Sequence, residues 1–226
     1  MKHFIFIIIF LSAIFNPIKN GFSKSAAEQG NFKYEAAESG PFIDMQFDVG
    51  RYVADGNSSG VSNGGLLSAG FITAEDLWER REYSVGIFFK SLQNNRDRVS
   101  IPGGGQFKFA YGYRLGKDYY AHWLLGLGMG SAKLRRKKGQ AFYENVDPLW
   151  AQLGMLGFQL DSVIGNNLSF RAGFKWSHLI CSIDELRSGD QIEKLNRTEH
   201  FNTYEISMGL RFKFANTRRR AQRFSN

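Results

Sequence analysis

The chain has 226 residues, with 29 Lys and Arg against 21 Asp and Glu, which gives a formal net charge of +8. An apolar content of 43%, with 15% aromatic residues, excludes a disordered chain, and the length suits one domain or two small ones. Cys181 is the single cysteine, which excludes an internal disulfide framework and a cysteine-based zinc site.

The excess positive charge is concentrated in three short segments. Three lysines lie within the first 26 residues, four arginines follow Asn216, and five cations lie between Lys133 and Lys138. Without them the rest of the chain carries a formal charge of −4. We therefore expect no nucleic-acid partner, because a nucleic-acid-binding domain spreads its basic residues over one face of its fold.

The first 26 residues are typical of a secretory signal peptide. Lys2 precedes an uncharged run from Phe4 to Phe15, which is shorter than the roughly 20 apolar residues of a membrane-spanning helix. Small residues then form an acceptable cleavage pattern at Ser25-x-Ala27. We expect cleavage at about residues 25–27 and a lead-in over 27–40.

After the signal peptide the dominant pattern is strict alternation of apolar and polar residues, and no segment of 18 apolar residues predicts a transmembrane helix. Between Gly105 and Leu115 every second residue is aromatic or leucine. Such alternation predicts half-buried strands. The expected strands are 43–50, 66–73, 83–90, 105–115, 119–129, 149–159, 167–179 and 203–214.

The connections between these segments alternate in length. Long connections at 55–65, 92–104, 130–148 and 180–200 alternate with short ones at 74–79, 116–118 and 161–166. This order predicts an all-β, eight-stranded, antiparallel up-and-down barrel over residues 41–214. Aromatic residues near both ends of the apolar faces favour a transmembrane β-barrel. The alternative is a secreted soluble barrel that turns its apolar faces inward and binds an apolar ligand.

The last strand alternates and ends on an aromatic residue, and it is similar to the C-terminal strand by which outer-membrane barrels are recognised during insertion. This insertion signal comprises Tyr204, Ile206, Met208, Leu210, Phe212 and Phe214. Over residues 41–214 the chain resembles small bacterial outer-membrane β-barrel proteins of the OmpX/OmpA-like eight-stranded family. One departure is that the chain continues for twelve residues beyond Phe214, to Asn226.

The resemblance implies a location in the outer membrane of a Gram-negative bacterium, with periplasmic turns and termini and four long extracellular loops. The implied partners are outer-membrane lipid and lipopolysaccharide, the insertion machinery and periplasmic chaperones during assembly, and an unidentified surface ligand. The function we expect is non-enzymatic presentation of the loops, in adhesion, envelope integrity or ligand contact.

The polar faces of the strands predict what fills the barrel. An eight-stranded barrel is only wide enough for its own side chains, and charges buried there must pair. We expect a network that closes the lumen, with an ion-conducting path along it as the alternative. The expected members are Asp44, Gln46, Asp48, Lys108, Arg114, Arg171, Lys175, Glu205, Arg211 and Lys213.

Five cations in the expected loop 130–148 form a candidate contact for anionic lipid or another anionic surface, and a solvated loop is the alternative. They are Lys133, Arg135, Arg136, Lys137 and Lys138. The arginines of the tail 215–226 could meet inner-leaflet head groups or the cell wall, or belong to a disordered segment.

An enzymatic alternative is centred on His178, with Ser177 or Ser182 as its partner in a lipid A acyl hydrolase or transferase. Lipid A deacylases of this kind keep His and Ser two residues apart on one face, and this chain does not match that spacing. His122 is expected inside the barrel. No metal cluster, phosphate loop or nucleotide fingerprint is recognisable, so no cofactor is expected. Cys181, in an expected outer loop, could be a free thiol or pair with another molecule.

Overall fold

The computed structural model describes residues 39–55, 58–74, 78–116, 118–145, 149–165 and 167–214. These segments form nine β-strands. In the same segments no helix is long and apolar enough to cross a membrane. The expected signal peptide, nearly all of the lead-in and the basic tail lie outside the described residues.

The strands in chain order are β1 (Gly40–Ala54), β2 (Ser59–Ala74), β3 (Glu79–Gln93), β4 (Asp97–Arg114), β5 (Tyr119–Lys138), β6 (Ala141–Asn145), β7 (Leu149–Val163), β8 (Leu168–Ser188) and β9 (Gln191–Lys213).

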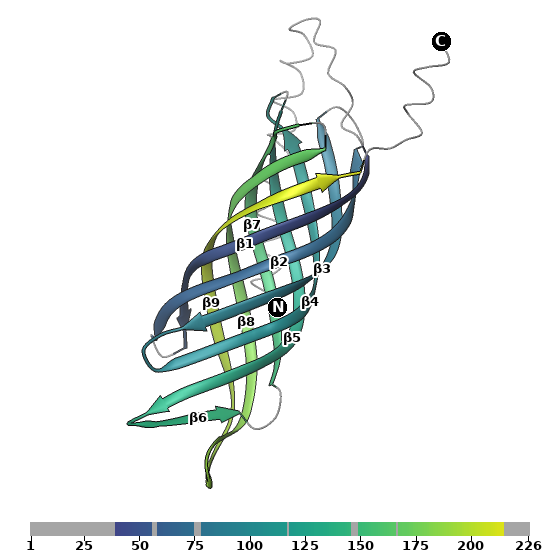
Figure 1. Ribbon diagram of the computed structural model, residues 1–226. Coiled ribbons are helices and arrows are strands. Elements are labelled where there is room, and N and C mark those ends of the chain that lie inside the picture. Colours follow the sequence, from purple (N-terminus) through teal and green to yellow (C-terminus); the bar gives the residue numbers. More distant parts are fainter. Residues whose placement is uncertain are drawn as a thin grey trace, which may run out of the picture. The chain divides into compact units, whose positions relative to one another are not determined.

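Eight of these strands form a closed antiparallel ring. Each of β1 to β4 pairs with the next strand, β5 pairs with β7, and β7, β8 and β9 follow in order. The last strand returns to the first, with pairs from Phe42 and Lys213 to Ala54 and Phe201. Figure 1 shows the ring strands tilted side by side. The eight-stranded up-and-down barrel expected from the alternation is therefore confirmed, and β6 is an additional short strand between β5 and β8.

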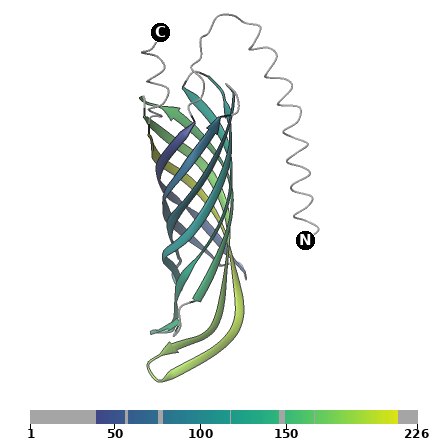
Figure 2. The same cartoon turned by 90° about the vertical axis from the view of Figure 1, so that its right-hand side faces the viewer.

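The two ends of the barrel differ in how far the strands project. Short connections join β2 to β3, β4 to β5, and β7 to β8, at what we call the turn end. The opposite end, which we call the hairpin end, carries β6 and the projecting β8–β9 hairpin (Figure 2). The described termini of the barrel, Gly40 and Lys213, lie at the turn end, close to the turn that links β7 to β8.

At the hairpin end the strands are much longer than expected. Most of the expected loops 92–104, 130–148 and 180–200 is strand, and β8 pairs with β9 as far as Ser188 and Gln191. A register shift between Ile183 and Glu185 brings Leu186 to the inward face. The expectation of loops was wrong because charged outward residues and this bulge obscure the apolar alternation in the sequence.

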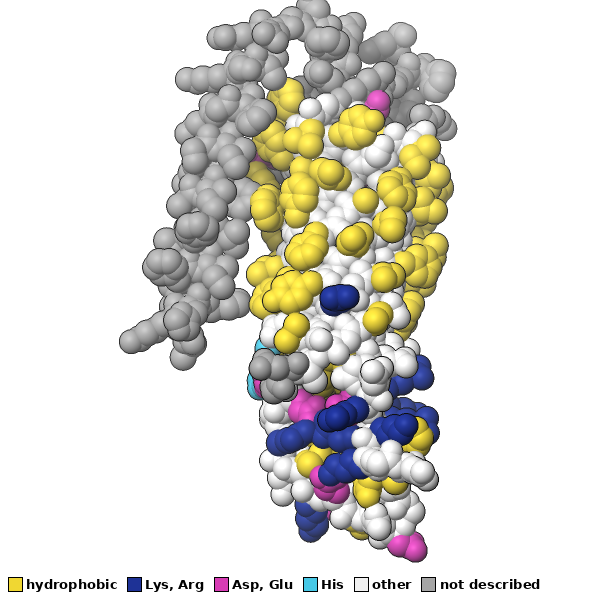
Figure 3. Space-filling model, turned by 90° about the vertical axis from the view of Figure 1, so that its left-hand side faces the viewer, with side chains coloured by type: hydrophobic (Ala, Val, Ile, Leu, Met, Phe, Trp, Pro, Cys, Tyr) yellow, Lys and Arg dark blue, Asp and Glu magenta, His cyan; other side chains and the backbone are white. Residues whose placement is uncertain are grey.

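The outward faces of the ring strands carry a band of exposed apolar side chains, which we call the apolar belt. Val85 and Ile87 on β3 are 63% and 66% exposed, and Leu127 on β5 and Ile206 on β9 are similarly exposed. Figure 3 shows hydrophobic side chains over the part of the surface toward the turn end, with charged side chains gathered toward the hairpin end. The outward orientation of the apolar faces is the reverse of that in a soluble barrel with an apolar cavity.

The interior is polar only toward the turn end. Toward the hairpin end it is filled by buried apolar side chains, which we call the apolar plug. The apolar plug was not predicted, because many of its inward residues lie in segments that were expected to be loops. The plug consists of Tyr52, Leu66, Phe88, Leu92, Val99, Ile101, Ala132, Leu134, Leu149, Ala151, Leu153, Leu179, Cys181, Ile183, Leu186 and Phe201.

Candidate functional site

A cluster of buried charges fills the lumen near the turn end. Three arginines at most 2% exposed face three carboxylates at most 2% exposed, and the six come from five strands. Buried ion pairs of this kind must satisfy one another, because water is not available to solvate them. The cluster, which we call the ionic cluster, consists of Asp44, Arg80, Glu82, Asp161, Arg171 and Arg211.

Arg171 contacts all three carboxylates of the ionic cluster. Its Nη1 lies 2.6 Å from Asp44 Oδ2, and its Nε lies 2.6 Å from Asp161 Oδ1. Its Nη2 donates to Glu82 Oε2 at 3.2 Å. Arg211 approaches the same Glu82 carboxylate through both terminal nitrogens, at 2.5 and 2.6 Å. The guanidinium groups therefore tie β1, β3, β7, β8 and β9 together across the barrel.

His122 on β5 is fully buried beside this cluster, as expected for a lumen residue. Its Nε2 lies 2.5 Å from Arg80 Nη2. Glu82, His122 and Asp161 are close enough together to be metal ligands. The donor set does not suit a cation, however, because Arg80 and two further arginines already neutralise these carboxylates at close range.

A second polar layer lies between the ionic cluster and the apolar plug. Lys90 Nζ is 2.9 Å from Glu205 Oε2, and Ser62 Oγ donates to Glu205 Oε1 at 2.5 Å. Lys175 Nζ is 2.6 Å from Asp48 Oδ1. A cavity of about 20 Å³ between these groups has room for little more than one water molecule.

Every expected member of the lumen network faces inward. Asp44, Gln46, Lys108, Arg114, Arg171, Lys175, Glu205 and Arg211 are buried, and Asp48 and Lys213 are partly exposed. Lys108 Nζ donates to Asp44 at 3.0 Å, and Arg114 Nε donates to the carbonyl of Gly116 at 2.9 Å.

Sequence reasoning missed four charged lumen residues, Arg80, Glu82, Lys90 and Asp161. Arg80 and Glu82 precede the expected strand 83–90, and Asp161 follows the expected strand 149–159. Lys90 is the last residue of the expected strand 83–90 and faces inward, although the expected network does not include it. Arg80 and Glu82 could have been predicted by extending the alternation of the strand backward, because each lies an even number of residues before the inward residue Ser84.

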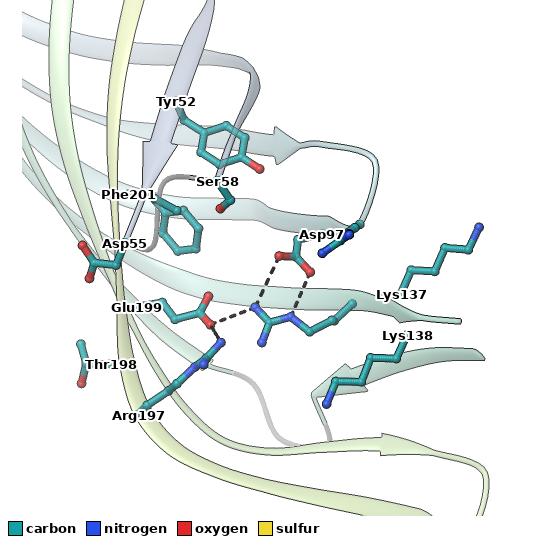
Figure 4. A pocket seen from close by; sticks show the side chains of 13 residues that line it. Tyr52, Asp55, Ser58, Asp97, Lys137, Lys138, Arg197, Thr198, Glu199 and Phe201 are labelled. Carbon is teal, nitrogen blue, oxygen red and sulfur yellow. Dashed lines mark hydrogen bonds and ion pairs between the residues drawn. The ribbon is translucent and has the colours of Figure 1, made fainter. Parts of the chain in front are cut away.

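Beyond the apolar plug the hairpin end opens into a cavity of about 540 Å³, which we call the mouth (Figure 4). Tyr52 and Phe201 form part of its lining, with their rings edge to face and 5.9 Å apart. Arg136 spans the cavity, donating from Nε to Asp97 Oδ1 and from Nη2 to Glu199 Oε1, both at 2.9 Å. Burial lowers the pKa of Arg136, but these two hydrogen bonds and the two negative charges outweigh it and raise the pKa above its ordinary value.

All five expected lipid-contacting cations lie on strand β5 rather than in a loop, so the alternation of the strand divides them. Lys133 and Arg135 point outward and are exposed, whereas Arg136 turns into the mouth. Lys137 and Lys138 also line the mouth, and Lys138 Nζ pairs with Glu193 Oε1 at 2.5 Å.

An exposed arginine of β4 joins the outward pair. Arg98 is the direct cross-strand partner of Arg135, and Lys133 lies two residues further along β5. We call these three residues the outward basic set. Arg135 Nε pairs with Glu144 Oε1 at 3.2 Å in an exposed position, so that pair contributes little. Within the described segments, Arg98 and Lys133 make no ion pair.

The proposed catalytic partners of His178 are not brought together. Ser177 faces the lumen, 1% exposed, with its Oγ 3.5 Å from Lys90 Nζ, whereas His178 faces outward. Ser182 is on the outward side but four residues further along β8, roughly 13 Å away at the usual rise of a strand. Neither serine forms a nucleophile–base pair with His178, so this geometry does not support the acyl hydrolase or transferase.

No protein-family model matches the chain, and no curated protein matches it. Solved structures with a similar fold include Neisserial surface protein A, at 13% identity and a TM-score of 0.47, covering 78% of this chain and 99% of that one. The attachment invasion locus protein Ail of Yersinia pestis matches at 14% identity and a TM-score of 0.43, covering 76% and 99%. OprG of Pseudomonas aeruginosa matches at 9% identity and a TM-score of 0.40, covering 82% and 100%. Likeness at this level carries no argument about function.

Proposed function

We propose that the protein is a non-enzymatic outer-membrane β-barrel of a Gram-negative bacterium, closed to diffusing solutes, that presents its mouth and hairpins at the cell surface. The observation that carries this proposal is the apolar belt around a closed ring. A continuous apolar surface of this kind is unfavourable in water but matches the hydrocarbon core of a bilayer. Closure leaves the ring without unpaired backbone edges, as a bilayer requires.

Orientation follows from the two ends of the barrel. The turn end carries short connections and both described termini of the barrel, as the periplasmic ends of such barrels do, whereas the hairpin end carries long extensions. The expected signal peptide would direct export, with insertion machinery and periplasmic chaperones as partners in assembly. The insertion signal from Tyr204 to Phe214 supports this, because its six apolar side chains are 42–61% exposed on the outward face.

The filled lumen supports a closed barrel over an ion-conducting one. The ionic cluster, the second polar layer and the apolar plug occupy successive levels from the turn end to the hairpin end. An ion on this route would have to leave water and pass between apolar side chains of the plug, which is costly. We therefore assign the interior charges to holding the barrel together rather than to conduction.

The outward basic set supports a contact with phosphate groups of lipopolysaccharide. Arg98 and Arg135 lie directly opposite each other, and like charges in that position are destabilising unless an anion lies between them. The set also lies next to the apolar belt, since Met129, four residues before Lys133 on β5, is outward and 57% exposed. Lipid head groups at the edge of the bilayer would supply that anion. The mouth, lined by cations and acids together, is where we place contact with the unidentified surface ligand.

Cell fractionation combined with gel electrophoresis of unboiled and boiled samples tests the proposed location. We expect the protein in the outer-membrane fraction and a shift in mobility on boiling, because a closed barrel resists unfolding in detergent. Recovery in the soluble periplasm, with identical mobility before and after boiling, would contradict the proposal.

Planar-bilayer recording tests the closed lumen. We expect no stepwise conductance from the wild-type protein, because three layers of side chains fill the barrel. Defined conductance steps that disappear on Arg211→Glu would show instead that ions pass along the ionic cluster.

A further inference from the structure

On the outside of the barrel two histidines from neighbouring strands meet. His178 lies on β8 and His200 on β9, diagonally across the ladder, since Ile180 pairs with His200 and His178 pairs with Asn202. Their rings are nearly parallel, with centroids 5.3 Å apart, and His200 Nδ1 lies 3.3 Å from His178 Nε2. Both side chains are partly exposed, so the pair is accessible from solvent.

The orientation of the His178 ring is set by its neighbours. Nδ1 of His178 lies 2.9 Å from the side-chain oxygen of Asn202, which can only accept a hydrogen bond. In the neutral ring the proton therefore sits on Nδ1, and Nε2 presents its lone pair toward His200. The ring of Trp176 is nearly parallel to that of His178, with centroids 6.4 Å apart. A histidine held in this way by an oxygen acceptor resembles a metal ligand with its supporting hydrogen bond.

The distance between the two nitrogens fits a shared metal ion. Two nitrogens that each bind Zn²⁺ at about 2.05 Å with tetrahedral geometry lie about 3.3 Å apart. Two imidazoles are therefore the protein nitrogens that this part of the surface offers to a metal ion. Imidazole nitrogens select zinc, nickel and copper over magnesium and calcium, which prefer oxygen ligands.

We propose that His178 and His200 form a binding site for a divalent transition-metal ion such as Zn²⁺ on the outer wall of the barrel. His178 Nε2 and His200 Nδ1 are the protein ligands, and water completes the coordination. Asn202 positions the His178 ring without touching the metal. The site is separate from the mouth and from the outward basic set, so it is independent of the contact with lipid phosphate.

Isothermal titration of the full chain in detergent with ZnCl₂ tests the site, using a purification tag that contains no histidine. We expect one saturable site in the wild-type protein and at least a tenfold loss of affinity in both His178→Ala and His200→Gln. Asn202→Leu should weaken binding by about 10- to 100-fold, as loss of an orienting hydrogen bond does elsewhere. Ser182→Ala, on the same outward face, is the matched control and should bind as the wild type does.

A second readout uses Co²⁺, whose visible absorption reports tetrahedral nitrogen coordination. We expect this absorption in the wild type and in Ser182→Ala and its loss in both histidine variants. Each variant is first shown to keep its mobility shift on boiling, so that a misfolded barrel is recognised. The absence of saturable Zn²⁺ binding in the wild type, or unchanged affinity in both histidine variants, would overturn the proposal.

Discussion

Arg171 on β8 and Asp44 on β1 meet inside the barrel, with Nη1 and Oδ2 2.6 Å apart, although 127 residues separate them in the chain. Strand β9 lies between these two strands in the ring. The contact therefore crosses the junction where the last strand closes on the first, and it forms only when the barrel is complete.

We expect Arg171→Met to lower the free energy of unfolding by about 3–5 kcal/mol, because it removes a buried cation that lies 2.6 Å from both Asp44 and Asp161. Urea unfolding in detergent micelles, followed by tryptophan fluorescence, measures this change. Arg98→Met removes an exposed arginine instead and should change the free energy by about 0.5 kcal/mol or less. Equal effects of the two substitutions would show that the ionic cluster does not hold the barrel together.

The apolar belt predicts that a charge is tolerated only outside it. Ile87→Lys places an ammonium group on the belt, at a residue 66% exposed, and should cost roughly 2–4 kcal/mol if that residue lies near the middle of a bilayer. Ile192→Lys is the matched control, because Ile192 is 50% exposed on the projecting β8–β9 hairpin. Yield of folded barrel in the outer membrane measures both. A soluble barrel would accept the two lysines equally well.

The apolar plug predicts an unreactive thiol at Cys181, which is 1% exposed and is therefore unavailable for a bond to another molecule. A polyethylene glycol maleimide should leave the folded protein unlabelled and label it fully after boiling in detergent. As a control, Ser182→Cys in a Cys181→Ala background puts the thiol on the exposed outward face, where labelling should be rapid. Fast labelling of native Cys181 would mean that the plug is open.

The outward basic set predicts a specific response to lipid phosphate. Adding lipid A with both phosphates should raise the temperature at which the barrel loses its compact gel mobility, and lipid A without phosphate should not. The double substitution Lys133→Ser and Arg135→Ser should remove most of this increase, as should high salt, because exposed charges are screened. Lys194→Ser removes an exposed cation from the projecting hairpin and should have no effect. If the double variant responded to lipid A as the wild type does, Lys133 and Arg135 would not be part of the lipid contact.

The amino-acid sequence by itself determined the number of ring strands and their outward faces. Alternation is a local property. The face of the strand on which a residue such as Phe107 lies can therefore be predicted from its immediate neighbours in the sequence. The same alternation predicted that Asp44, Arg171 and Arg211 face the inside of the barrel, although it did not predict the contacts between them. Because an eight-stranded barrel is narrow, these charges had to pair inside it. The sequence did not determine which carboxylate meets which arginine.

Only the tertiary structure decided what depends on register and on strand length. The hairpin-end extensions are strands because they pair with one another, as Asp97 does with Arg136 and Ile183 with Arg197. This pairing places Cys181 and its neighbours in an apolar plug. Extension of β5 also divided the basic run, sending Arg136 into the mouth and Arg135 outward. The meeting of His178 with His200 depends on the register of β8 against β9, in which a shift of one residue would turn one of the two rings to the other face.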